Sequence, residues 1–115
     1  GQHLGGMIAP SPTLMREALA QRAPQLDVAD GERRDFATDT ADALATGCDL
    51  AAVGLLVHAH ALASRRLGES PELLLSGGGA PELLAALPLP HEFIERSGAQ
   101  EFCQRRSGLC REQIS

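Results

Sequence analysis

Apolar side chains recur at helical spacing in two long stretches of the chain. In the first stretch they fall on one face of a helix expected over residues 13–21. The residues of this face are Leu14, Met15, Ala18 and Leu19. Ser11 can cap the first turn, Pro12 suits the first helical position, and Pro24 ends the helix. The pattern therefore predicts a helix that is buried on one side.

A longer helical region begins at about Asp39. Its apolar stripe consists of Ala41, Leu44, Cys48, Leu55, Ala59 and Leu62. Gly47 interrupts the pattern, so the region is either one bent helix or two helices. Over residues 50–63 only His58 and His60 carry polar side chains, and a helix that is apolar nearly all round is buried on more than one side. This region is therefore either the central helix of the domain or a helix that packs against a partner chain.

Three shorter segments have the composition of strands: residues 2–8, 73–75 and 91–94. The first is interrupted by two glycines, and the second is apolar and too short for a helix. A further helix is expected over residues 81–87, where prolines follow it. Strands that alternate with helices predict an α/β fold in which helices cover a small sheet.

The chain is expected to hold one domain, residues 1–95, followed by an atypical polar tail, residues 96–115. Within the domain, residues 24–37 are expected to form a polar loop, and residues 32–35 a solvated run of charges. Two or three strands make a thin sheet for a complete domain, and the residues after Gly1 have the pattern of a strand interior. We therefore expect this chain to be part of a longer protein.

Composition narrows the classes of function. The chain has 115 residues and a net charge of −5, with no Lys, Tyr or Trp. An acidic chain is a poor match for the nucleic-acid backbone, so nucleic-acid binding is not expected. Three widely spaced cysteines predict neither a disulfide framework nor a zinc site, which favours a reduced, cytoplasmic setting. The longest uncharged stretch, residues 50–64, is shorter than the ~20 residues of a membrane span.

Gly77-Gly78-Gly79 lies between an expected strand and an expected helix. Such a turn either lets a nucleotide approach the backbone at a helix start or is simply a flexible connection. It matches neither a Rossmann fingerprint nor a Walker loop, which would need a lysine. Gly5-Gly6 is similarly either a ligand-facing turn or a bulge in an edge strand.

Residues 38–40, Thr-Asp-Thr, stand at the start of the long helix. Each of them can cap it, and a hydroxyl there can also bind a substrate. Asp42 lies in the first turn, where the helix dipole favours a carboxylate. His58 and His60 are roughly 200° apart around a helix, so they cannot share a metal ion from one face. No metal site and no catalytic triad are predicted.

Three blocks, in this order and at about the same spacing, resemble type III pantothenate kinases, a family that includes the Bvg accessory factors. Residues 3–10, His-Leu-Gly-Gly-Met-Ile-Ala-Pro, are similar to the family's Gly-Gly-x-Ile-x-Pro-Gly block. Residues 39–47, Asp-Thr-Ala-Asp-Ala-Leu-Ala-Thr-Gly, resemble its Asn-Thr-x-x-Ala-Ile-x-x-Gly helix start. Residues 73–80, Leu-Leu-Leu-Ser-Gly-Gly-Gly-Ala, resemble its Thr-Gly-Gly-Asp/Gly-Ala turn.

The resemblance implies the C-terminal half of an actin-like (ribonuclease H-like) fold of the sugar-kinase type. It implies that the intact protein phosphorylates pantothenate with ATP, the first step toward coenzyme A, using Mg²⁺ and a monovalent cation, K⁺ or NH₄⁺. It also implies a homodimer that forms through the helix region 40–66. The family's phosphate loop, catalytic Asp and cation-binding Asp are expected upstream of Gly1, so no catalytic residue is assigned to this chain.

The resemblance carries over a few site residues. Thr40 matches the threonine whose hydroxyl contacts pantothenate. Gly77 and Gly78 would lie beside the nucleotide, and Gly5 and Gly6 would form a turn on the pantothenate side.

This chain departs from the family pattern at three positions: Asp39 replaces Asn, Ser11 replaces Gly and Ser76 replaces Thr. Two alternatives to the kinase stay open. One is a regulatory or interaction protein of the accessory-factor type without catalysis. The other is a structural fragment that dimerises through residues 40–66.

Overall fold

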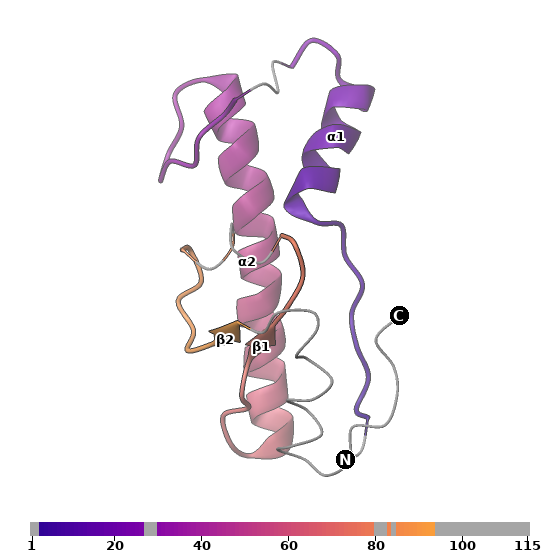
Figure 1. Ribbon diagram of the computed structural model, residues 1–115, viewed down its shortest axis with the longest axis vertical. Coiled ribbons are helices and arrows are strands. Elements are labelled where there is room, and N and C mark those ends of the chain that lie inside the picture. The colour runs from indigo at the N-terminus through magenta and orange to yellow at the C-terminus, as the bar shows by residue number, and fades with distance from the viewer. Residues whose placement is uncertain (1–2, 27–29, 80–82, 84, 94–115) are drawn as a thin grey trace.

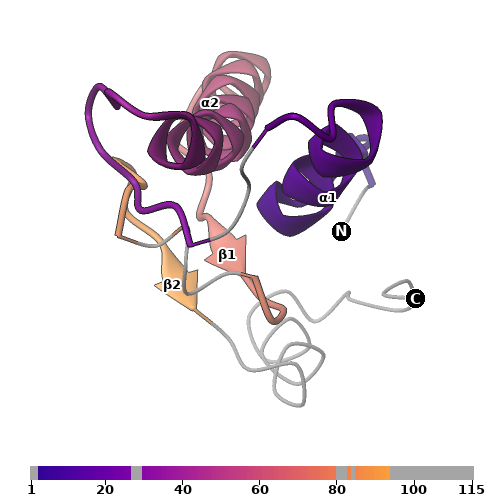
Figure 2. The same cartoon turned by 90° about the horizontal axis from the view of Figure 1, so that it is seen from above.

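A computed structural model gives the fold of residues 3–26, 30–79, 83 and 85–93. These residues form two helices and two short strands, in the order α1, α2, β1, β2 (Figure 1). The long helix α2 is the axis of the molecule. Helix α1 lies beside one half of α2, and the two strands lie beside the other half (Figures 1 and 2).

Helix α1 spans Pro12–Arg22 and begins and ends where the sequence predicts. The Ser11 hydroxyl accepts a hydrogen bond from the Leu14 N–H at 3.2 Å, and Pro12 occupies the first helical position. Arg22 in the last turn suits the negative end of the helix dipole.

Helix α2 spans Thr40–Leu67 as one continuous helix, so Gly47 does not divide it. Of the three candidate caps, Asp39 is the one used: its carboxylate accepts the Asp42 N–H at 2.9 Å. Gly68 ends the helix in the left-handed conformation, with φ 74°, which glycine adopts without strain.

Strands β1 (Leu74–Leu75) and β2 (Glu92–Phe93) pair in parallel. Leu74 lies opposite Glu92 and Leu75 opposite Phe93. Two of the three predicted strands are thereby confirmed, and the described residues form a partial α/β arrangement with little sheet. Of the helix expected over residues 81–87, residues 83 and 85–87 are described, and Ala85 and Ala86 form a turn, closed by the Ala86 N–H on the Leu83 carbonyl at 3.1 Å, rather than a continuing helix. The tail 96–115 lies outside the described residues.

The first predicted strand is wrong over its described part, because residues 3–10 form no strand. These residues run alongside the molecule as an extended segment (Figure 1). Their apolar side chains are exposed, and Ile8 is fully so. A strand needs a neighbour to pair its backbone groups, and among the described residues such pairing is seen between β1 and β2.

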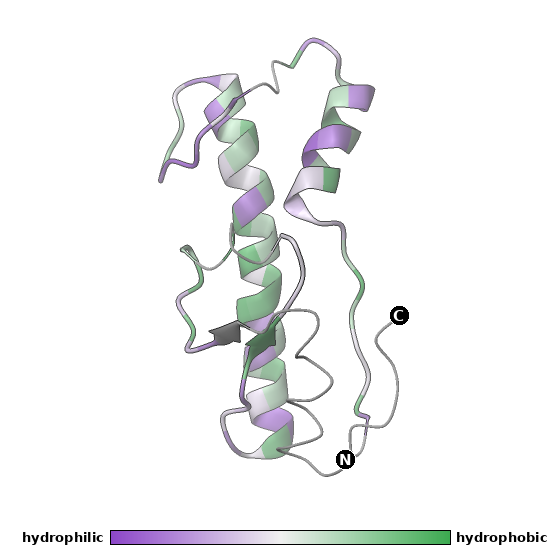
Figure 3. Ribbon diagram, in the orientation of Figure 1, coloured by the Kyte–Doolittle hydropathy of each residue, from purple (hydrophilic) through white to green (hydrophobic). Residues whose placement is uncertain are grey.

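The burial of α2 is one-sided. Its buried residues are Ala45, Thr46, Cys48, Asp49 and Val53. The prediction of a helix buried on more than one side is therefore not met by the described residues: α2 is hydrophobic along much of its length (Figure 3), yet Leu50 and Leu67 are exposed. The helix is long and apolar enough to cross a membrane, contrary to the estimate from the uncharged stretch. This is weak evidence, since the core helix of a soluble protein has the same length and composition.

Candidate functional site

The first turn of α2 carries the residue that the resemblance assigns to substrate binding. Thr40 is the first residue of the helix, directly after the cap Asp39, and it is exposed. A hydroxyl at this position projects from the positive end of the helix dipole, where polar and anionic groups are favoured. The geometry leaves the Thr40 hydroxyl open to a ligand.

Residues 31–34 cross the outside of the first two turns of α2. The Glu32 N–H donates to Asp42 Oδ1 at 2.8 Å, and Arg34 Nε donates to Asp42 Oδ2 at 3.3 Å. One turn further along, the Arg34 N–H donates to Thr46 Oγ1 at 2.9 Å. Both oxygens of the Asp42 carboxylate are thus used to bind this segment.

The hydrogen bonds to Asp42 favour its ionised form. Its pKa lies below the ordinary value of 3.8, first because of the Glu32 N–H and then because of the Arg34 guanidinium, while desolvation acts in the opposite direction. Arg34 also binds Glu32 through Nη2 at 2.9 Å. Asp42 therefore accepts these bonds as a carboxylate at neutral pH.

Close packing supplies a further attachment. Gly31 lies against the backbone of α2, with the carbonyl group of Ala41 and the N–H of Asp42 in its way. A Cβ at this position would overlap the Ala41 carbonyl. Glycine is required here because a side chain would not fit. Its backbone conformation is not the reason, since the φ of Gly31 is not positive.

A buried carboxylate joins three segments deeper in the molecule. Asp49 is 6% exposed and binds Arg16 of α1, with Oδ1 2.7 Å from Nη2. Arg33 approaches the other oxygen at 3.9 Å. Asp49 thus connects α1, the 31–34 segment and α2, and the pairing compensates its loss of water.

The charge run at 32–35 is exposed, as expected, but Arg33 and Arg34 are in addition paired with the long helix. Both guanidinium groups bind carboxylates of α2. A sequence feature of α2 could have predicted these contacts. Asp42, Thr46 and Asp49 are spaced by four and three residues, so they form a polar stripe on a mostly apolar helix. Such a stripe needs polar partners, and the neighbouring loop supplies them.

An apolar groove of about 750 Å³ lies between α1 and α2. Its walls include Leu14, Met15 and Leu19 on α1 and Leu44 and Cys48 on α2. Cys48 is buried, and desolvation raises the pKa of its thiol, an effect that the nearby Asp49 reinforces and Arg16 opposes. The groove holds no group suited to phosphate chemistry.

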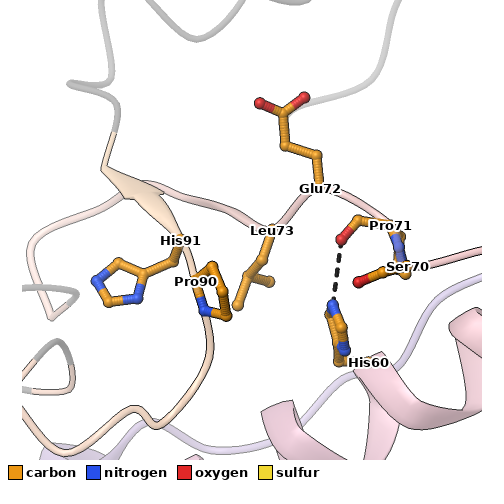
Figure 4. A pocket seen from close by; sticks show the side chains of 7 residues that line it. All are labelled: His60, Ser70, Pro71, Glu72, Leu73, Pro90 and His91. Atoms are coloured by element: carbon orange, nitrogen blue, oxygen red, sulfur yellow. Dashed lines mark hydrogen bonds between the residues drawn. The ribbon is translucent and has the colours of Figure 1, made fainter.

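The second histidine of the long helix connects α2 to the segment before β1. His60 Nε2 donates to the Pro71 carbonyl at 3.1 Å, at the edge of a pocket of about 250 Å³ (Figure 4). His91, across the pocket, lies 2.7 Å from the Leu89 carbonyl through Nδ1. His60 is half-buried and His58 is exposed.

The glycine turns are placed apart from Thr40. Gly77 follows β1 with φ 106°, and Gly5 has φ 116°, so both turns use conformations that favour glycine. Among the hydrogen bonds of the described residues, none joins either turn to Thr40. Among the described residues no group of three His, Cys, Asp or Glu side chains could hold a metal ion. The candidate residues thus do not form one closed site within the part of the chain that the structure describes.

An exposed hydroxyl at a helix start and a glycine turn after a parallel strand are compatible with part of an α/β phosphotransferase. The sequence profile described as type III pantothenate kinase matches residues 1–61 of the chain. The chain belongs to this family.

Curated relatives agree with the profile. A type III pantothenate kinase of Stenotrophomonas maltophilia (strain K279a) is 56% identical over 88 residues, which is 76% of this chain and 36% of the relative. Those of Xanthomonas campestris pv. campestris (strain B100) and Xanthomonas oryzae pv. oryzae (strain PXO99A) are 54% and 53% identical over the same shares. The chain thus spans about a third of the length of the relatives it matches.

Proposed function

We propose that this chain is the C-terminal part of an enzyme that transfers the γ-phosphoryl group of ATP to pantothenate. The observation that carries the proposal is the family membership together with the position of Thr40, exposed at the start of α2. The two-helix, parallel-strand arrangement is consistent with half of an actin-like fold. The cytoplasm, where pantothenate and ATP meet, is the proposed location.

In this proposal the chain binds and orients rather than reacts. The Thr40 hydroxyl binds pantothenate, while Gly77 and Gly78 let the nucleotide approach the backbone after β1. Gly5 and Gly6 form a turn on the pantothenate side. Phosphoryl transfer depends chiefly on positioning and charge stabilisation, so such contacts contribute directly to the rate.

The described residues of this chain offer no ligand set for the metal ions of the proposed reaction. The described residues contain no cluster suited to Mg²⁺, and no cation site for K⁺ or NH₄⁺ is derived from them. By the family resemblance, the general base and the metal-nucleotide contacts belong to the part of the proposed kinase that lies upstream of this chain.

A homodimer is the proposed assembly. One face of α2 carries Ala43, Gly47, Leu50 and Gly54, which fall within about 60° of arc at 3.6 residues per turn. Leu50 is 46% exposed, and the space beside both glycines is open. Small residues along an apolar stripe allow two helices to approach closely, which supports pairing of α2 with a second copy.

The test uses a chimera. The matched 88-residue segment of the Stenotrophomonas kinase is replaced by the corresponding segment of this chain, and pantothenate-dependent ADP release is measured. We expect turnover by the chimera and none by the 115-residue chain alone. Thr40→Ala should raise the KM for pantothenate about tenfold, the range of one hydrogen bond to substrate, with little change in the KM for ATP.

A conservative variant is the control. Thr40→Ser keeps the hydroxyl and should keep the KM for pantothenate within about twofold of the unmutated chimera. Equal losses for both substrates in Thr40→Ala would contradict the assigned role of the hydroxyl. A folded, dimeric chimera without turnover would favour the non-catalytic accessory alternative.

A further inference from the structure

We infer that residues 31–34 are a positioning clamp, which holds the first turn of α2 in place and thereby sets the affinity of the site at Thr40 for pantothenate. The inference rests on the proposed function, because it takes the Thr40 hydroxyl to be the group that binds substrate. It adds Thr46, Asp42 and the clamp as positioning residues that do not themselves touch the substrate.

The clamp is attached at two successive turns of α2. Asp42, in the first turn, accepts the Glu32 N–H at 2.8 Å and Arg34 Nε at 3.3 Å. Thr46, in the second turn, is 7% exposed and accepts the Arg34 N–H at 2.9 Å. Attachment at both turns fixes the direction of the clamp along the helix as well as its distance from it.

The clamp and the helix cap meet at Asp42. The Asp42 N–H donates to the cap carboxylate of Asp39, while the Asp42 side chain accepts from the clamp. Thr40 lies between these two residues and is exposed. A displacement of the clamp therefore changes the turn that carries Thr40, although the clamp makes no hydrogen bond to Thr40 itself.

The strength of the clamp lies in its backbone donors. The Arg34 and Glu32 side chains are 58% and 73% exposed, so their ion pair contributes little. The Arg34 N–H, in contrast, binds a buried hydroxyl and loses its partner if that hydroxyl is removed. Thr46 is therefore the position at which the clamp is most sharply tested.

The kinetic experiment uses Thr46→Val and Thr46→Ser in the chimera described above. Valine keeps the shape of threonine but removes the acceptor, and serine restores it. We expect Thr46→Val to raise the KM for pantothenate about three- to tenfold, the range of one hydrogen bond, with the KM for ATP unchanged. Thr46→Ser should return the KM for pantothenate to that of the unmutated chimera.

Ser64→Ala is the matched control. Ser64 is another hydroxyl of α2 with a single hydrogen-bond partner among the described residues: it is half-buried and donates to the His60 carbonyl of the same helix at 2.8 Å, remote from the clamp. Its removal should leave both KM values unchanged. A rise in both KM values with Thr46→Val, without rescue by serine, would overturn the positioning role and indicate general destabilisation.

Hydrogen exchange of the 115-residue chain provides a readout that does not depend on activity. We expect the Arg34 amide to exchange at least fivefold faster in Thr46→Val than in Thr46→Ser, because it is the donor of the tested bond. Equal exchange in both variants would overturn the clamp itself. If the chimera shows no pantothenate-dependent turnover while the exchange of the Arg34 amide changes as expected, the proposed function is wrong. The clamp then remains as a purely structural element.

Discussion

At the scale of single residues, Gly31 is a position where adding one methyl group is expected to lower the stability of the chain clearly. A methyl group there would overlap the backbone of Ala41, which cannot rotate out of the way. We expect Gly31→Ala to lower the free energy of unfolding by about 1–3 kcal/mol, the usual cost of overpacking. Urea denaturation measures it.

Gly47→Ala is the control for Gly31→Ala. Gly47 also lies on α2's surface, but the space beside it is open and it stands in a helix. Alanine favours helix over glycine by up to about 1 kcal/mol, so this variant should be as stable as the natural chain or more so. A Gly31→Ala variant of unchanged stability would mean that the loop does not pack on α2 as described.

Cys48 should react slowly with alkylating agents. It is 5% exposed, and desolvation raises the pKa of its thiol above the ordinary value of 9.0. Because the thiolate is the nucleophile, its fraction at pH 8 is smaller than for a free thiol. In a Cys103→Ser/Cys110→Ser chain, iodoacetamide should label Cys48 at least about tenfold more slowly than in urea, and the rate should still rise between pH 8 and pH 9. Equal rates with and without urea would contradict the burial.

At the scale of elements, the sequence predicted where helices begin and end better than what they touch. Caps such as Ser11 and Gly68 act within a few residues, so local composition reveals them. The partners of Asp42 and Asp49 come from segments 8 to 33 residues away in the chain. A polar stripe shows that partners are needed, but which loop supplies them depends on the tertiary fold.

The same distinction explains the wrong strand and the unassembled site. Residues 3–8 have strand composition, but a strand forms only beside another strand, which composition alone does not supply. The roles of Thr40 and of the glycine turns were inferred from family motifs. Motifs give the spacing of residues along the sequence, not their distances in the folded chain. Their separation in this chain follows from the length of α2, which carries Thr40 at one end while β1 lies beside its other half (Figure 1).

The ion pair between Arg16 and Asp49 should hold α1 against α2. Asp49 is buried and Arg16 is 31% exposed on its side chain, so Asp49→Ala leaves a partly buried guanidinium without its partner. We expect a loss of about 1–3 kcal/mol, less than for a fully buried pair because water reaches Arg16. A double-mutant cycle with Arg16→Ala and Asp49→Ala should give a coupling energy of about 1 kcal/mol.

The exposed pair of Arg34 and Glu32 is the control for this cycle. Its N–O distance of 2.9 Å is nearly as short as the 2.7 Å between Arg16 and Asp49, but both side chains are mostly exposed. Its coupling energy should therefore be close to zero. Equal coupling in the two pairs would show that burial is not what gives the Arg16–Asp49 contact its strength.

At the scale of the whole molecule, α2 has more apolar surface than the described residues cover. Its buried residues lie on one side, whereas Leu50 at 46% exposed and Leu67 at 47% exposed face outward. A long apolar helix with an open side is stabilised when another surface covers it. The relatives are nearly three times as long as the matched segment, so in the proposed kinase the covering surface would be either another part of the same protein or a second copy.

Charge substitution on the exposed stripe tests the second copy. Leu50→Glu places a carboxylate in the middle of the stripe formed by Ala43, Gly47, Leu50 and Gly54, where a dimer would have to desolvate it twice. We expect the active chimera to sediment as a dimer and the Leu50→Glu variant as a monomer at the same concentration. Leu67→Glu is matched in exposure but lies about 100° away around the helix, so it should leave the dimer intact. If both variants remain dimeric, the stripe is covered within one chain of the kinase, and the dimer uses another surface.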